Sequence, residues 1–210
     1  MFEVETETVA VESPLQVREK ISFEDYLKKY DGQHAEWVNG EVELRMPAAD
    51  RRQDTSDFLV SVLRAWVENK NAGIVRSSPL AMKTREDRKG REPDVLFLGK
   101  ANLHRLKPTF VDGAADLVIE IISPESRARD RGEKFYEYEQ AGVRELWLID
   151  ADRRQAEFFV LDETGIFQIV LAAEEKFESR VLPGVFVRTE WLWRDDLPSL
   201  IEVLKEWKLV

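Results

Sequence analysis

The sequence predicts an α/β fold in which helices cover a sheet. An apolar run at residues 117–122 is followed by a helical pattern that ends at Gly142, and then by a second apolar run at 145–150. A strand, a helix and a strand in this order form a right-handed crossover, so we expect the two strands to be parallel neighbours or near neighbours. With 210 residues, 43% of them hydrophobic, the chain can bury a core. We therefore expect one α/β domain over residues 21–210, after a flexible acidic leader at 1–20.

The first part of this domain is expected to alternate helices with strands. Ser22 can cap a short helix, because its side-chain oxygen can accept a hydrogen bond from a free backbone amide. The Asn39-Gly40 dipeptide stands between two short strand patterns and is typical of a type I′ hairpin turn. Apolar residues at helical spacing then predict a long amphipathic helix, with its start capped at residues 54–56.

Further strands are predicted in the middle of the chain and toward its end. The patterns give strands at 74–76, 80–83 and 94–98, a hairpin within 157–170 and more β structure up to Val187. A last helix is expected to be capped by Asp196. Trp191, Trp193 and Trp207 could form a dimer patch, but aromatic residues beside a helical stripe more often complete a core.

The composition excludes several classes of site. Cysteine is absent, which excludes disulfide scaffolds, thiol nucleophiles and cysteine-rich zinc sites. With His34 and His104 as the two histidines, any intrinsic metal is expected to be a hard cation held by carboxylates. The chain lacks both a run of about 18–20 apolar residues and the pattern of a secretory leader. We therefore expect a cytoplasmic protein that does not contact a membrane.

A formal net charge of -10 argues against a protein that coats nucleic acid by bulk electrostatics. Basic residues nevertheless stand before Asp94 and after Glu120 in the sequence. They are Lys83, Arg85, Arg88, Lys89 and Arg91 on the first side, and Arg127, Arg129, Arg131 and Lys134 on the second. Acidic residues are interleaved with them, so these runs are either two solvated loops or local contacts to phosphate groups.

Two acids and one lysine form the main candidate site. Glu120 lies within an apolar run, so its buried carboxylate requires a compensating cation, metal ion or proton. Asp94 opens a strand, and Lys134 follows on a helix that places Asp130 and Tyr138 on the same face. Each residue also has a structural reading: Asp94 as a turn cap, Glu120 as a member of an ion pair and Lys134 as a surface charge. Brought together at the ends of adjacent strands, they would suit metal-assisted attack of water on a phosphodiester.

Paired carboxylates also serve glycosidases, although Lys134 and the basic loops would have no role in that chemistry. A serine hydrolase is not favoured, because neither Ser123 nor Ser126 stands in a Gly-x-Ser-x-Gly elbow.

Several blocks in the same order resemble one known family. They are 35–41, 92–97, 116–124, 134–150 and 182–184. Over about residues 22–190 the chain resembles the Uma-two family of restriction-endonuclease-like proteins, within the PD-(D/E)XK nuclease superfamily. The resemblance implies a restriction-endonuclease-like mixed central sheet flanked by helices, with additional β-hairpins. It also implies an endonuclease that uses Mg²⁺ or Mn²⁺ and acts on nucleic acid, with DNA the first expectation, and it is compatible with a homodimer.

The resemblance also assigns roles to residues. Asp94 and Glu120 match the two acids of the superfamily motif, and Glu36 matches a further acidic position that can add a metal oxygen. The main-chain carbonyl of Ile121 would complete the metal site. Lys134 matches the catalytic lysine of the related family.

The chain departs from the superfamily pattern at two places. Ile122 stands two residues after the second acid, where most members carry the lysine. Residues 50–53 lack the histidine that relatives often have before the long helix. A nuclease-like fold that binds or regulates without catalysis is therefore the alternative hypothesis.

Overall fold

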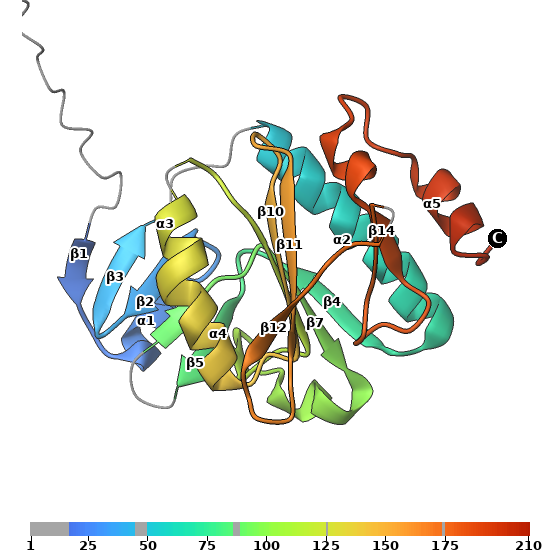
Figure 1. Cartoon of the computed structure of the whole chain (residues 1–210). Coiled ribbons are helices and arrows are strands. Elements are labelled where there is room, and N and C mark those ends of the chain that lie inside the picture. Colours follow the sequence, from blue (N-terminus) through green and yellow to red (C-terminus); the bar gives the residue numbers. More distant parts are fainter. Residues whose placement is uncertain (1–16, 45–49, 86–88, 125, 174) are drawn as a thin grey trace, which may run out of the picture.

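The computed structural model describes residues 17–44, 50–85, 89–124, 126–173 and 175–210, which are coloured along the chain in Figure 1. Two six-stranded mixed sheets and the helices beside them make up this part of the chain, which confirms the predicted α/β class. No helix within the described ranges is long and apolar enough to cross a membrane.

The first sheet is built mainly from N-terminal segments. Its strand order is β1 (Val17–Lys20), β3 (Glu41–Leu44), β2 (Ala35–Val38), β6 (Lys89–Arg91), β5 (Ala81–Arg85) and β8 (Phe110–Asp112). The β2–β3 hairpin is confirmed, since Asn39 and Gly40 have φ angles of 52° and 87°. Residues 17–20, which the composition assigned to the leader, instead pair with β3. A polar edge strand can form through backbone hydrogen bonds alone, so β1 has no apolar pattern from which it could be predicted.

The second sheet holds the strands that carry the candidate site. Its order is β12 (Phe167–Val170), β11 (Gln155–Leu161), β10 (Glu145–Asp150), β9 (Leu117–Ile121), β7 (Val95–Gly99) and β4 (Gly73–Ser77). The β9–β10 pair is parallel, as the strand-helix-strand order predicts. The pairs on either side are antiparallel, which makes the sheet mixed.

Helices and short segments connect these strands. They are α1 (Phe23–Lys29), α2 (Asp50–Lys70), η1 (Lys100–Arg105), α3 (Arg127–Arg129), η2 (Asp130–Lys134), α4 (Phe135–Ala141), η3 (Thr189–Trp193), α5 (Leu200–Glu206) and the small sheet β13 (Lys176–Glu178) and β14 (Phe186–Arg188). The segment η2 is a π-helical turn, and it joins α3 to α4 without a break. Gly142 ends α4 with a left-handed backbone, at φ 85°, as its position in the sequence predicts.

The two faces of the second sheet pack against different helices (Figure 1). Leu117, Ile119 and Ile121 of β9 belong to a core that includes apolar residues of α2. Val118 points the other way and joins a core that includes Tyr138 of α4 and Met82 of the first sheet. Since side chains alternate along a strand, Glu120 faces the α4 side. The acid is thus directed toward the space between the two sheets.

The starts of two helices differ from the local capping signals. Helix α2 begins at Asp50 instead of at residues 54–56, because tertiary contacts extend its first turn. Arg51 donates a hydrogen bond to the Leu192 carbonyl, and the hydroxyl of Thr55 donates to the Arg51 carbonyl inside the helix. Ser199, not Asp196, caps the last helix.

Ser199 forms a capping box with Glu202, in which each side chain accepts a hydrogen bond from the other residue's amide. The C-terminal tryptophans complete the core, because Trp191 and Trp207 are buried and Trp193 packs against the same cluster.

Candidate active site

The strand register places the two motif acids directly across from each other, at the adjoining ends of the neighbouring strands β7 and β9. In the antiparallel β7–β9 ladder, Val95 is the partner of Ile119, so the next position on each strand sets Asp94 opposite Glu120. Glu120 is fully buried, and Asp94 is 7% exposed. Both carboxylates lie out of bulk water, as the sequence predicts for Glu120.

Lys134 meets two of the predicted acids in a buried ion-pair cluster. Its Nζ lies 2.8 Å from Oε1 of Glu36 and 3.0 Å from Oε1 of Glu120. All three side chains are 0% exposed. The acids come from different sheets, on β2 and β9, and the lysine comes from the π-helical turn η2. The tertiary structure thus brings together three residues that the sequence predicted separately.

Asp94 binds different partners. Its Oδ1 and Oδ2 accept hydrogen bonds of 2.7 Å and 2.9 Å from Nη2 of Arg52, in the first turns of α2. Its Oδ2 also accepts a 2.8 Å hydrogen bond from the backbone amide of Ile121. Asp94 is therefore fixed to the main chain of the residue that follows Glu120. Arg52 lies in the segment that lacks the histidine of the related family.

Arg91 is a site residue that the sequence did not single out. Its Nη1 donates a 3.0 Å hydrogen bond to Glu36, and its Nε and Nη2 bind both oxygens of Glu137 at 2.6 Å and 2.9 Å. Glu133 lies 3.0 Å from Nη2. Burial alone would lower the pKa of Arg91, but these carboxylates raise it well above its usual value. Arg91 is thus a fixed cation that holds Glu36 beside Lys134.

The signal for Arg91 in the sequence was ambiguous. It belongs to the basic run before Asp94, where it was considered with its neighbours as a solvated or phosphate-binding charge. Nothing in the run distinguishes Arg91, whose guanidinium is fully buried, because its partners Glu36 and Glu137 lie on β2 and α4.

Tyr138 orients the second acid. Its hydroxyl donates a 2.5 Å hydrogen bond to Oε1 of Glu120, the oxygen that also contacts Lys134. Burial raises the pKa of Tyr138 well above its usual value, and the charges of Glu120 and Glu36 raise it further. The hydroxyl therefore stays protonated and acts as a donor.

Glu43 adds a further acid next to this cluster. It is the cross-strand partner of Glu36 in the β2–β3 hairpin, and it is partly buried. Partial burial raises the pKa of Glu43, and the negative charge of Glu36 adds to this effect. Like charges at opposed positions of a hairpin repel, so this pair weakens the hairpin while it concentrates negative potential near Lys134.

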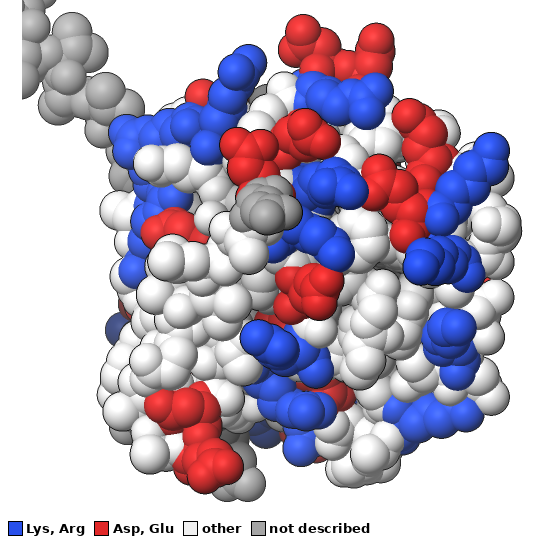
Figure 2. Space-filling view, turned by 45° about the vertical axis from the view of Figure 1, so that its right-hand side comes forward, with Lys and Arg blue, Asp and Glu red and all other residues white. Residues whose placement is uncertain are grey.

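The basic loops are largely engaged with acidic residues. Arg127 and Arg131 bind Asp150 at 2.8 Å and 3.4 Å, and Arg131 also binds Glu157 at 2.7 Å. Residues 86–88 of the other loop lie outside the described residues. Figure 2 shows basic and acidic side chains interleaved over the face that it presents, and not a continuous basic stripe. The second run is therefore not a solvated loop: it lies in the helical segments α3 and η2, its three arginine side chains are 14–24% exposed, and Lys134 is buried.

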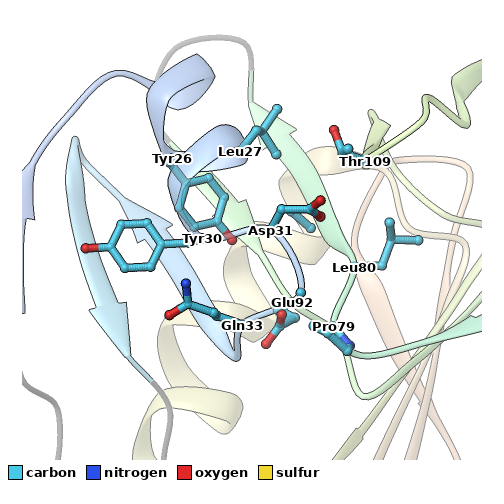
Figure 3. A pocket seen from close by; sticks show the side chains of 11 residues that line it. Tyr26, Leu27, Tyr30, Asp31, Gln33, Pro79, Leu80, Glu92 and Thr109 are labelled. Atoms are coloured by element: carbon cyan, nitrogen blue, oxygen red, sulfur yellow. The ribbon is translucent and has the colours of Figure 1, made fainter.

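A small pocket lies beside the cluster (Figure 3). Its volume is about 20 Å³, enough for about one water molecule. Tyr26, Tyr30 and Pro79 line it, and the buried side chain of Glu92 reaches its wall. The backbone amide of Glu92, just after β6, donates a 3.4 Å hydrogen bond to Glu36 and so links the wall of the pocket to the cluster. A nucleotide would not fit here.

The donor set fits a hard divalent cation in chemistry, although the carboxylates bind cations of the protein. Asp94, Glu120 and Glu36 offer oxygen atoms of the type that Mg²⁺ and Mn²⁺ prefer. Lys134 and Arg52 now take the positions of counter-ions to these acids. Across the described part of the chain, no group of three or more acidic or histidine side chains is arranged to hold a metal ion.

Comparisons with known proteins agree on one class. A family model described as Uma2, putative restriction endonuclease, matches residues 23–190. A crystal structure of a putative nuclease belonging to DUF820, from Anabaena variabilis ATCC 29413, superposes with a TM-score of 0.62. The two chains are 15% identical, and the match covers 76% of this chain and 89% of that one. At this identity the likeness shows the fold. No curated protein matches the chain.

Proposed function

Because the chain belongs to the Uma2 family of putative restriction endonucleases, we propose that it is a divalent-cation-dependent endonuclease that hydrolyses phosphodiester bonds, with DNA as the first substrate to test. The observation that carries this proposal is the close approach of Asp94 to the end of β9, where Glu120 lies. Asp94 accepts a hydrogen bond from the Ile121 amide, and the side chain of Glu120, the residue before Ile121, accepts one from Lys134. The two acids and the lysine therefore lie together at the end of β9.

Asp94, Glu120 and Glu36, with the main-chain oxygen of Ile121, would hold Mg²⁺ or Mn²⁺. Such an ion supplies Lewis acidity and lowers the pKa of a bound water. This assignment is supported by the oxygen chemistry of the acids and by their burial.

The residues of the chain have separate tasks in this proposal. Lys134 presents a buried ammonium that can orient a water molecule or steady a phosphate oxygen. Tyr138 fixes the rotamer of Glu120, and Arg91 fixes Glu36 through a charged hydrogen bond. Arg52 orients Asp94 through hydrogen bonds to both of its carboxylate oxygens. Geometry is thus maintained by partners that do not themselves touch the substrate.

A cleavage assay tests the proposal. Purified protein, with and without EDTA, is incubated with duplex DNA, single-stranded DNA and RNA in the presence of Mg²⁺ or Mn²⁺. Cleavage by the parent protein is expected to fall by about 100-fold or more in Asp94→Asn and Glu120→Gln. Equal cleavage by the parent and both variants would show a contaminating nuclease and would refute the assignment.

Asp116→Asn is the matched control in this assay. Asp116 is a buried carboxylate at the other end of β9, with partners of its own. Its variant should retain cleavage, so a loss in all three variants would indicate a general effect of removing a buried charge.

A non-catalytic binding protein is the second candidate, because Lys134, Arg52 and Arg91 already form ion pairs with the three acids. The same panel of nucleic acids decides between the two. Binding without cleavage at any divalent cation would favour this second function. A cytoplasmic homodimer also belongs to the proposal, and sedimentation of the full chain tests the dimer.

A further inference from the structure

Asp130 is a buried carboxylate to which the proposed mechanism gives no role. It is 0% exposed and begins the π-helical turn η2. Within the described part of the chain, neither of its carboxylate oxygens has a hydrogen-bond partner. A buried carboxylate that lacks hydrogen bonds is costly, so its retention in the fold calls for a specific compensation.

Two cations form ion pairs with Asp130 that are longer than a hydrogen bond. Nζ of Lys134 is 3.5 Å from its Oδ1, and Nε of Arg129 is 3.9 Å from the same atom. A hydrogen bond between charged groups spans about 2.7–2.9 Å. Lys134 therefore lies a fraction of an ångström outside a direct bond to Asp130, while it bonds directly to Glu36 and Glu120.

The ammonium of Lys134 lies between Glu36 and Glu120, where a divalent cation would have to bind. It bridges Oε1 of Glu36 and Oε1 of Glu120, and it is fully buried. A divalent cation that binds Glu120 would meet this positive charge at close range, and expelling the ammonium into solvent would require opening the packed space between the sheets. A nearby acceptor inside the protein removes that difficulty.

We propose that Asp130 is a second docking position for the Lys134 ammonium, which moves from Glu120 to Asp130 when a divalent cation binds. The two residues are four apart on the same turn, and the flexible lysine stem allows the short movement. Lys134 would then remain buried next to the metal instead of competing with it. Asp130 is a positioning residue in this inference, which rests on the proposed function because it concerns the same site.

The test is a binding cycle with Mn²⁺ alone, measured by calorimetry on the full chain without nucleic acid. The proteins are the parent, Lys134→Met, Asp130→Asn and the double variant, with Asp116→Asn as the control. Lys134→Met should bind Mn²⁺ at least about tenfold more tightly, because the competing charge is gone. Asp130→Asn should bind about tenfold more weakly than the parent, and Asp116→Asn should not change.

The double variant decides whether Asp130 acts through the lysine. In the Lys134→Met background, Asp130→Asn should change Mn²⁺ affinity by less than about threefold, because its effect depends on the ammonium. An equal weakening in both backgrounds would make Asp130 a metal ligand or a general negative charge, and would overturn the inference. Absence of Mn²⁺ binding in the parent and in Lys134→Met would also overturn it.

If Asp130→Asn does not fold, nitrogen-15 spectra of lysine ammonium groups in the parent provide the second measurement. The Lys134 signal, assigned by its loss in Lys134→Met, should shift as Mg²⁺ is added. A signal that stays unchanged while Mg²⁺ binds would refute the movement.

Cleavage by the same preparations separates this inference from the proposed function. A binding cycle of the expected form without cleavage refutes the nuclease and leaves the movement of Lys134 standing. Cleavage together with additive effects of Lys134→Met and Asp130→Asn on Mn²⁺ affinity supports the nuclease and refutes the movement of Lys134.

Discussion

The two ends of strand β9 each bury an acid, but they compensate its charge differently. At the start, Asp116 accepts hydrogen bonds from the Gly99 amide at 2.8 Å and from the Asn102 side chain at 2.9 Å. Arg144, whose side chain is 62% exposed, adds a contact at 3.3 Å. At the other end, Glu120 is held by the buried ammonium of Lys134 and by Tyr138.

Glu145, on the neighbouring strand, follows the pattern of Asp116. It accepts hydrogen bonds from the Trp147 indole at 2.7 Å and from the backbone amides of Arg180 and Val181 at 2.6 Å and 3.0 Å. Burial nevertheless raises the pKa of Glu145. Neutral N–H donors of this kind fix a loop to the sheet, and a bound cation cannot take their place without breaking that attachment. A lysine can be exchanged, which makes the Glu120 end suitable for metal chemistry.

The largest expected effect is the difference in the free energy of unfolding between removing a buried cation, Arg91, and removing an exposed one, Arg144. Arg91→Met leaves Glu36 and Glu137 without their shared guanidinium, so the free energy of unfolding should fall by about 3–5 kcal/mol. Arg144→Ala, beside Asp116 at the start of β9, should cost at most about 1 kcal/mol because its side chain is solvated. Urea unfolding of both variants measures the difference. Equal losses would contradict the view that charge compensation is concentrated at one end.

The second effect concerns the neutral-donor end. Asp116→Asn retains the shape of the side chain but replaces one acceptor oxygen with a donor, opposite the amide of Gly99 or the amide group of Asn102. We expect a loss of about 1–3 kcal/mol in the free energy of unfolding, from urea titration. Unchanged stability would mean that these bonds contribute little.

The third effect concerns the hydroxyl that orients Glu120. Tyr138→Phe removes a 2.5 Å hydrogen bond in a fully buried position and should lower the free energy of unfolding by about 1.5 kcal/mol. Tyr136→Phe is the matched control, because Tyr136 lies two residues away and is 58% exposed. Thermal unfolding compares the two variants, and similar shifts in Tm would argue against a role for the Tyr138 hydroxyl.

The smallest effect depends on pH. Since burial and Glu36 raise the pKa of Glu43 above its ordinary 4.5, its negative charge destabilises the folded state at neutral pH. The penalty decreases as pH falls through the raised pKa, and it vanishes below the ordinary value, where the carboxyl is protonated in both states. Glu43→Gln should therefore add about 0.5 kcal/mol at pH 7 and nothing near pH 4, as measured by urea unfolding.

Glu41→Gln is the control on the same strand, because Glu41 pairs with Lys20 and is not opposed by Glu36. It should give no gain at either pH. A gain in Glu41→Gln equal to that in Glu43→Gln would indicate a general effect of net charge.

The sequence by itself determined the local elements and one electrostatic requirement. The Asn39-Gly40 hairpin and the parallel pairing of β9 with β10 followed from turn chemistry and from element order. The need of Glu120 for a compensating partner followed from its apolar neighbours, since desolvation depends on the immediate surroundings of a charge. Glu120 does have such a partner in the structure.

Only the tertiary structure decided which partner each acid has. Lys134 was a candidate from its place after the Glu120 strand and from family resemblance, whereas nothing distinguished Arg91 and Arg52 from other basic residues. Glu36, on the first sheet, reaches Lys134 because the two sheets pack on either side of one helix. Ion pairs of this kind depend on distances across the fold, and a linear pattern of residue types carries no information on those distances until the sheets are assembled.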